Sequence, residues 1–190
     1  MSAHARLALP VTLAGLLFSL APLADARAAT SVYSDLYGAH CRALPTEPGN
    51  GTRTRRCAGV AGYGLLIHEA DATTSVDIVS PRGAHWPLDY WEVVTPGLAR
   101  VGRKAEWRME LRHGQLVPVA LLMRLDTANP RSNGPRMAAG AILVGARIAR
   151  DGACVVYRGN GATRSADEQA RSAVARARRC LGVLDAPGER

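Results

Sequence analysis

A cluster of three arginines, Arg53, Arg55 and Arg56, could bind an anionic group. Arg53 and Arg55 alternate along the chain, so on a β-strand their side chains share one face. Two guanidinium groups on one face would concentrate positive charge for a phosphate or carboxylate group. The alternative, which the sequence favours, is an ordinary solvated edge strand whose charges prevent strand-to-strand aggregation.

The segment from His85 to Trp91 contains a second set of candidate binding residues. Trp86, Tyr90 and Trp91 are three of the nine Phe, Trp and Tyr residues in the chain, and Asp89 lies between them. The segment has neither helical nor strand periodicity, and aromatic rings beside polar groups on a loop can form a platform for a sugar or a peptide. The alternative is that Trp86 and Trp91 fold back into the core, which is favoured because tryptophan usually buries most of its area.

Acid–base chemistry would need His68, Asp71, His85 or Asp89 to converge in one cleft. On a strand, His68 and Glu69 point to opposite faces, so a solvated cluster is favoured over a catalytic pair. The chain contains no zinc-ligand spacing, phosphate-binding loop or nucleophile-elbow motif. The sequence therefore assigns no catalytic residue, no metal site and no cofactor.

The N-terminus and the cysteines indicate an exported protein. Residues 1–28 combine a short basic start, an apolar run and an Ala-Arg-Ala cleavage site, which is the pattern of a signal peptide. We therefore expect a single domain over residues 29–190, in the periplasm or secreted. An even number of cysteines in an exported chain favours disulfides. Short loop closures predict two bonds, one between Cys41 and Cys57 and one between Cys154 and Cys180.

The net charge limits the choice of partner. The chain carries a formal charge of +8, and removal of residues 1–28 would leave +7. This charge favours an envelope glycan, an anionic lipid or an acidic protein. No recognised motif accompanies it, so nucleic acid is not expected. No second apolar run is long enough to span a membrane, and we expect no transmembrane segment after cleavage.

Hydrophobic periodicity predicts strands and one helix that could position these residues. Residues 105–112 alternate between apolar and charged types, which predicts a strand with one buried face. Residues 116–125 are apolar on both faces and predict a central strand, with a bulge at Pro118. Residues 141–149 and 153–157 predict a hairpin. An apolar stripe predicts one C-terminal helix over about 166–181. The expected fold is α+β, with a mainly antiparallel sheet, this helix packed on it, and disulfide cross-links.

Short landmarks span the mature region, namely Tyr33-Ser34-Asp35-Leu36 before Cys41, Cys57 with Gly62-Tyr63-Gly64-Leu65, Glu106-Trp107-Arg108, Pro118-Val119-Ala120-Leu121, and the final pair Cys154 and Cys180. On these landmarks the chain resembles a family of uncharacterised exported proteobacterial proteins. The resemblance implies export and two local disulfides, and it implies no activity.

Two functions follow from these observations. The first is a non-enzymatic envelope or secreted binding module for an anionic, glycan or protein partner. Its surface would combine the Trp86–Trp91 segment with basic residues. The alternative is a hydrolase acting on an envelope polymer. The absence of a catalytic motif favours the first.

Overall fold

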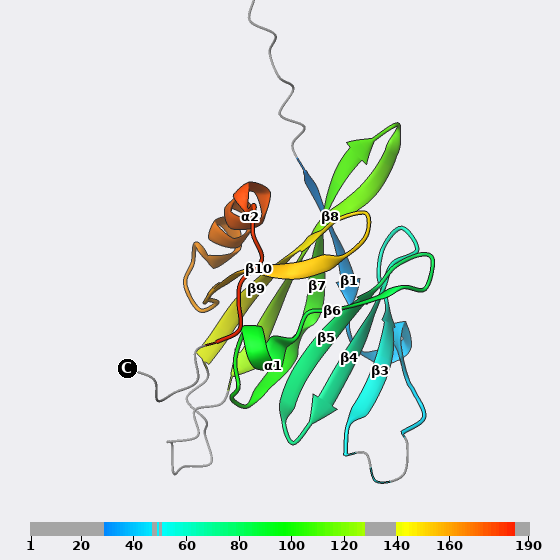
Figure 1. The fold of residues 1–190 in the computed structure, drawn as a ribbon, viewed down its shortest axis with the longest axis vertical. Coiled ribbons are helices and arrows are strands. Elements are labelled where there is room, and N and C mark those ends of the chain that lie inside the picture. Colours follow the sequence, from blue (N-terminus) through cyan, green and yellow to red (C-terminus); the bar gives the residue numbers. More distant parts are fainter. Residues whose placement is uncertain (1–28, 47–48, 50, 128–139, 185–190) are drawn as a thin grey trace, which may run out of the picture.

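The computed structural model describes residues 29–46, 49, 51–127 and 140–184, so the predicted signal peptide lies outside the described residues. Ten strands form two antiparallel sheets of five strands each (Figure 1). The first sheet has the order β1 (Thr30–Asp35), β7 (Ala99–Arg112), β8 (Gln115–Thr127), β9 (Gly140–Ile148) and β10 (Ala153–Asn160). The second has the order β2 (Cys41–Ala43), β3 (Arg53–Ala58), β4 (Gly64–Ala70), β5 (Thr73–Val79) and β6 (His85–Pro87).

Three helical segments complete the described fold, namely η1 (Gly38–His40), α1 (Tyr90–Val93) and α2 (Ala166–Arg176). The predicted antiparallel β-structure with a C-terminal helix is confirmed. The strands are divided between two sheets, which the sequence patterns alone did not separate. Among the described residues, no helix is long and apolar enough to cross a membrane.

The main hydrophobic core lies between the two sheets. Trp107 on β7 is completely buried, and its ring lies 6.3 Å from that of Tyr63, which precedes β4. Gly59 provides the room for this contact, because a Cβ at that position would lie 2.7 Å from the Trp107 ring. Residues on β7, β8 and β9 alternate, so their other set of side chains points away from this core.

Helix α2 covers that second face of the first sheet. Ala166, Ala170 and Val174 are buried against β8, β9 and β10. The fit is close, because a Cβ at Gly145 would lie 2.5 Å from a Val174 methyl group. The central strands of the first sheet are therefore buried on both faces where α2 covers them, which explains the continuous apolar run of residues 116–125. The bulge near Pro118 is also confirmed, since the β7–β8 register shifts there.

The predicted end of the helix is wrong. Helix α2 ends at Arg176 rather than near residue 181, and Ala177 has extended backbone angles. The Leu181 N–H donates to the Val155 carbonyl, at 2.8 Å, on the edge strand β10. The extended backbone lets the Leu181 N–H pair with a carbonyl on the edge of β10. If the helix continued to residue 181, that N–H would bond within the helix and the carbonyl would lack this donor. Cys180 therefore reaches Cys154 from an extended segment.

Both predicted disulfides are confirmed. Cys41 and Cys57 are direct partners across the β2–β3 pair, and Cys154 is bonded to Cys180. No described cysteine is free.

We predict that replacing Cys41 and Cys57 with serine will lower the free energy of unfolding by about 3 kcal/mol. The bond closes a loop with a sequence separation of 16, and opening it restores conformational entropy to the unfolded chain. Chemical denaturation of the oxidised protein and the double variant measures the difference. A loss below about 1 kcal/mol would contradict the chain-entropy argument.

Candidate functional site

A polar cleft of about 910 Å³ opens between the two sheets, where neighbouring strands stop pairing. Strand β1 pairs with β7 only as far as Lys104, so Ala99–Arg103 has no partner strand on that side. Strand β2 likewise pairs with β3 only from Arg55 to Cys57. The cleft lies between these two uncovered strand segments. Its principal side chains are Tyr37, Arg53, Arg55, Glu69 and Arg100.

Arg55 is the most unusual residue of the cleft. Its Nη1 atom lies 2.6 Å from a carboxylate oxygen of Glu69. Its Nε and Nη2 atoms are buried and have no hydrogen-bond acceptor. Buried donors are seldom left without an acceptor, because each one costs about 1–3 kcal/mol. The site therefore holds two strong donors without acceptors, covered by protein, at a cost in stability.

The two unpaired nitrogens of Arg55 form one bidentate fork. Nε and Nη2 lie on the same edge of a guanidinium group and match the two oxygens of one carboxylate. The same fork is occupied elsewhere in this protein, where Arg171 donates from Nε and Nη2 to the carboxylate of Glu106 at 2.7 and 2.9 Å. The fork of Arg55 can therefore bind one carboxylate or phosphate group.

Tyr37 holds the guanidinium group of Arg55 in place. Its ring centre lies 4.9 Å from the Arg55 Cζ atom, within the range of a cation–π contact. Its hydroxyl group donates to the Val101 carbonyl at 3.0 Å, which ties the ring to β7. Tyr37 nevertheless keeps 40% of its surface exposed. A ligand reaching the Arg55 fork must displace part of the protein that covers it.

The turn between β4 and β5 forms another wall of the cleft. Asp71 and Ala72 both have positive φ angles, of 47° and 65°, although neither is glycine. The turn is held against β7, because the Ala99 N–H donates to the Ala72 carbonyl and Thr74 Oγ1 donates to the Ala99 carbonyl. Positive φ at both central residues is the geometry of a type I′ turn, the usual connection of a two-residue β-hairpin. Here it places the turn beside Arg100.

The structure divides the three predicted arginines between two surfaces. Arg53 and Arg55 share the face that lines the cleft, and Arg53 is exposed and forms no ion pair with a described residue. Arg56 points to the opposite face and lines a separate cavity beside the Cys41–Cys57 disulfide. A single patch of all three arginines is therefore incorrect. Arg100 takes the third place in the cleft, and it too has no ion-pair partner among the described residues.

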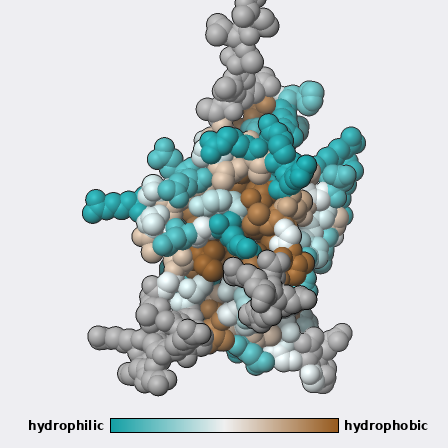
Figure 2. All heavy atoms as spheres, turned by 60° about the vertical axis from the view of Figure 1, so that its left-hand side comes forward, coloured by the Kyte–Doolittle hydropathy of each residue, from teal (hydrophilic) through white to brown (hydrophobic). Residues whose placement is uncertain are grey.

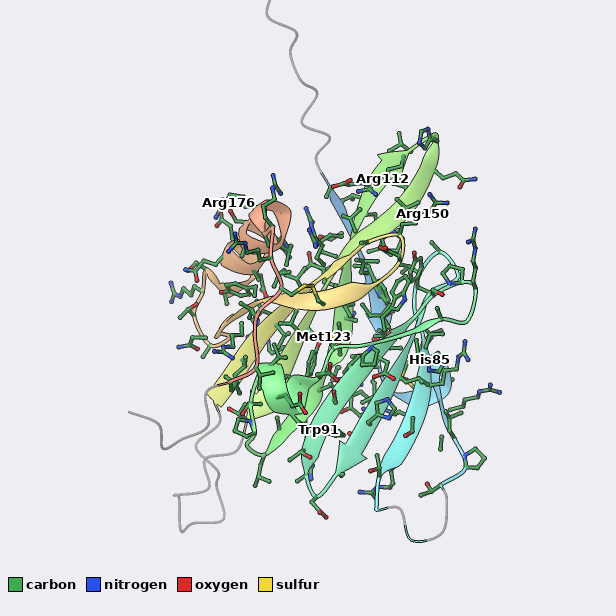
Figure 3. The ribbon with its side chains drawn as sticks, viewed as in Figure 1. His85, Trp91, Arg112, Met123, Arg150 and Arg176 are labelled. Atoms are coloured by element: carbon green, nitrogen blue, oxygen red, sulfur yellow. A yellow bond between two sulfur atoms is a disulfide. The ribbon has the colours of Figure 1, made fainter. Side chains whose placement is uncertain are left out.

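The predicted aromatic platform is divided by local structure. Trp86 lies on β6 and is partly buried, with its ring 6.1 Å from that of Tyr63. Tyr90 is buried in α1, and this burial raises its pKa. Asp89 is exposed just before α1, and Trp91 is 39% exposed. His85 and Trp91 lie far apart in Figure 3, which separates the two ends of the segment.

The candidate acid–base residues do not form one group. His68 Nε2 lies 3.1 Å from a carboxylate oxygen of Asp77, and His68 Nδ1 lies 3.1 Å from Thr54 Oγ1. Among the described residues, no hydrogen bond or ion pair joins His68 to Asp71, His85 or Asp89. Thr54, His68 and Asp77 thus form a hydroxyl–imidazole–carboxylate chain, the same order of groups that hydrolases with a hydroxyl nucleophile use. No group of three or more described His, Cys, Asp or Glu residues could hold a metal ion.

Comparisons with known proteins do not identify the site. No protein-family model matches the chain, and neither the curated proteins nor the solved structures contain a match. The resemblance to exported proteobacterial proteins therefore stays a prediction. The cleft must be interpreted from its own geometry and charge.

Proposed function

We propose that the protein is a non-enzymatic binding module for a glycan that carries carboxylate groups. The inter-sheet cleft is its binding site. Arg55 binds one carboxylate, and Arg53 and Arg100 supply further positive charge at the opening. The two disulfides and the +8 formal charge are consistent with a periplasmic or secreted protein that meets anionic polymers, and export belongs to this proposal.

The unpaired fork of Arg55 carries this proposal. A carboxylate would convert two buried donors without acceptors into two charge-assisted hydrogen bonds. An uncharged sugar hydroxyl can accept from only one of the two nitrogens at ideal geometry. The site is therefore expected to prefer an acidic glycan to its neutral counterpart.

The size and lining of the cleft favour a saccharide among the anionic partners. Its volume of about 910 Å³ lies within the range of ligand pockets, and is much larger than one carboxylate requires. Tyr37 offers an exposed aromatic surface, while the Glu69 carboxylate adds a hydrogen-bond acceptor to the walls. Aromatic and polar groups together suit the apolar faces and hydroxyl groups of a sugar ring.

The proposal predicts that the double variant Arg55→Met/Glu69→Gln will bind acidic glycans about tenfold or more weakly. It removes one bidentate contact, and a hydrogen bond to a charged group contributes about 1.5–3 kcal/mol. Net charge is unchanged because one cation and one anion are lost together. Isothermal titration with uronic-acid oligosaccharides, before and after methyl esterification, measures the affinity and its dependence on carboxylate groups.

A matched control removes the partly exposed ion pair between Arg124 and Asp167, at 3.1 Å, by Arg124→Met/Asp167→Asn. This control should bind as the wild type does, and both double variants should unfold within about 1 kcal/mol of the wild type. The proposal is wrong if no uronic-acid oligosaccharide binds, if esterified probes bind equally well, or if both double variants lose the same affinity.

The hydrolase remains the second candidate because Thr54, His68 and Asp77 form a hydrogen-bonded chain. In that case Thr54 would be the nucleophile, and His68 would accept its proton. The three side chains lie on the face of the second sheet opposite the cleft. Cleavage of an added oligosaccharide that is abolished by Thr54→Val but unaffected by Arg55→Met/Glu69→Gln would favour this candidate over simple binding.

A further inference from the structure

A second basic site lies on the other side of the first sheet, in a groove beside α2. Figure 2 turns this side of the molecule toward the viewer, and hydrophilic residues crowd its upper part. The groove has a volume of about 170 Å³. Its charged lining residues are Arg108, Glu110, Arg112, Arg147, Arg171 and Arg178. Five cations therefore surround a small space with one anion.

The strand register explains how the groove forms. Ala120 on β8 is the direct partner of Arg108 on β7 and of Arg147 on β9. Neighbouring strands lie about 4.8 Å apart, so the two arginines flank a small residue across about 10 Å of sheet. The methyl group of Ala120 leaves space between their long side chains. Val119, which the β-bulge leaves without a strand partner, also lines the groove.

Two of the arginines are fixed by a buried carboxylate. Glu106 is 7% exposed and binds Arg171 through both oxygens, at 2.7 and 2.9 Å. Arg108 lies 3.6 Å from the same carboxylate and donates to Ser31 and to the Ala29 carbonyl. These contacts position one wall of the groove before any ligand arrives. Preorganised donors lose less entropy on binding.

Two other arginines are available for a ligand. The side chains of Arg147 and Arg178 form no hydrogen bond or ion pair with another described residue. Arg147 is partly buried on β9, and Arg178 follows the end of α2. The C-terminal end of a helix disfavours an anion by about 0.3–1 kcal/mol. One charge-assisted hydrogen bond from a guanidinium group contributes about 1.5–3 kcal/mol, so the arginines outweigh the helix end.

We infer that this groove binds a phosphate group. A volume of about 170 Å³ accommodates a phosphate group, and the five guanidinium groups of the lining favour an anion over a neutral ligand. A phosphate also presents several oxygens in different directions, as the surrounding guanidinium groups require. This inference is independent of the acidic-glycan cleft, which lies between the two sheets.

The test is titration of the full protein with inorganic phosphate at low ionic strength. The double variant Arg147→Gln/Arg178→Gln should bind phosphate about 100-fold more weakly, because it removes two charged contacts. Neither side chain forms a hydrogen bond or ion pair with a described residue, so the variant should keep its unfolding midpoint. The control Arg42→Gln/Arg82→Gln removes the same charge from exposed positions on β2 and in the turn before β6 and should bind normally.

Vesicles containing phosphatidic acid distinguish the two sources of phosphate. Binding of both inorganic phosphate and vesicles, lost only in the groove variant, would identify a lipid headgroup as an acceptable ligand. Binding of inorganic phosphate alone would identify a soluble phosphate. The inference fails if the wild type binds no phosphate, or if the groove variant and its charge-matched control are weakened equally.

Discussion

Replacing Glu106 with alanine is expected to lower the free energy of unfolding by about 4 kcal/mol at neutral pH. Glu106 is buried on β7 and accepts hydrogen bonds from Arg171 of α2, at 2.7 Å, and from Ser31 of β1, at 2.5 Å. The change removes this link between helix and sheet and leaves partly buried guanidinium groups without their carboxylate. Urea denaturation at pH 7 measures the loss.

The effect of Glu106 should depend on pH in a defined direction. Burial alone would raise its pKa, but hydrogen bonds from Arg171 and Ser31 and the charges of Arg171 and Arg108 together lower it. A folded-state pKa below the unfolded value of about 4.3 gives stability that is present above that value. It is lost as the pH falls through the folded-state pKa. The difference between wild type and Glu106→Ala should therefore shrink in acid.

Glu110→Ala is the matched control, because Glu110 also pairs with an arginine on the same face of β7, and its side chain is 36% exposed. An exposed ion pair contributes only about 0–1 kcal/mol. Equal losses in the two variants, or a loss for Glu106→Ala that persists unchanged in acid, would contradict the assigned role of the buried pair.

Local sequence patterns predicted most elements of the first sheet. The alternation over residues 105–112 and the apolar run over 116–125 correspond to parts of β7 and β8. Pro118 indicated a bulge because proline cannot donate to a strand ladder. The apolar stripe placed α2 on the sheet, and cysteine spacing gave both disulfides. Each of these predictions depends on residues close in sequence.

The cleft was only half predictable because it depends on where distant strands stop pairing. Alternation placed Arg53 and Arg55 on one face. The structure then makes Glu69 on β4 the direct cross-strand partner of Arg53. Tyr37 and Arg100 come from other parts of the chain and carry no local signal. The end of α2 was missed for a similar reason, since Leu181 bonds to β10 rather than to its own helix.

The Trp86–Trp91 segment shows how tertiary contacts decide between two readings of one composition. The segment is too short for β6 and α1 to show a periodic pattern in the sequence. In the structure, β6 pairs with β5 and α1 packs against β5. Tyr90 and Leu88 are buried, whereas Asp89 and Trp91 remain exposed. The segment therefore closes part of the core while leaving one tryptophan at the surface.

Replacing Trp107 with alanine is expected to lower the free energy of unfolding by about 4 kcal/mol. The side chain is completely buried between the sheets, and Trp→Ala changes in cores cost about 3–5 kcal/mol. Its Nε1 atom also donates to Ser34 Oγ at 2.9 Å, so the hydroxyl group of Ser34 would lose a partner. Denaturation followed by far-ultraviolet circular dichroism measures the loss without depending on tryptophan fluorescence.

Trp91→Ala makes the same chemical change at a side chain that is 39% exposed, and it should cost less than about 1 kcal/mol. The comparison isolates burial as the cause, because the atoms removed are identical. The backbone at Gly59 packs directly against the Trp107 ring, since a Cβ there would lie 2.7 Å from it. Filling the cavity left by Trp107→Ala would therefore require the two sheets to move together. A loss for Trp107→Ala no larger than that for Trp91→Ala would show that the two sheets do not share the tightly packed core on which the cleft geometry depends.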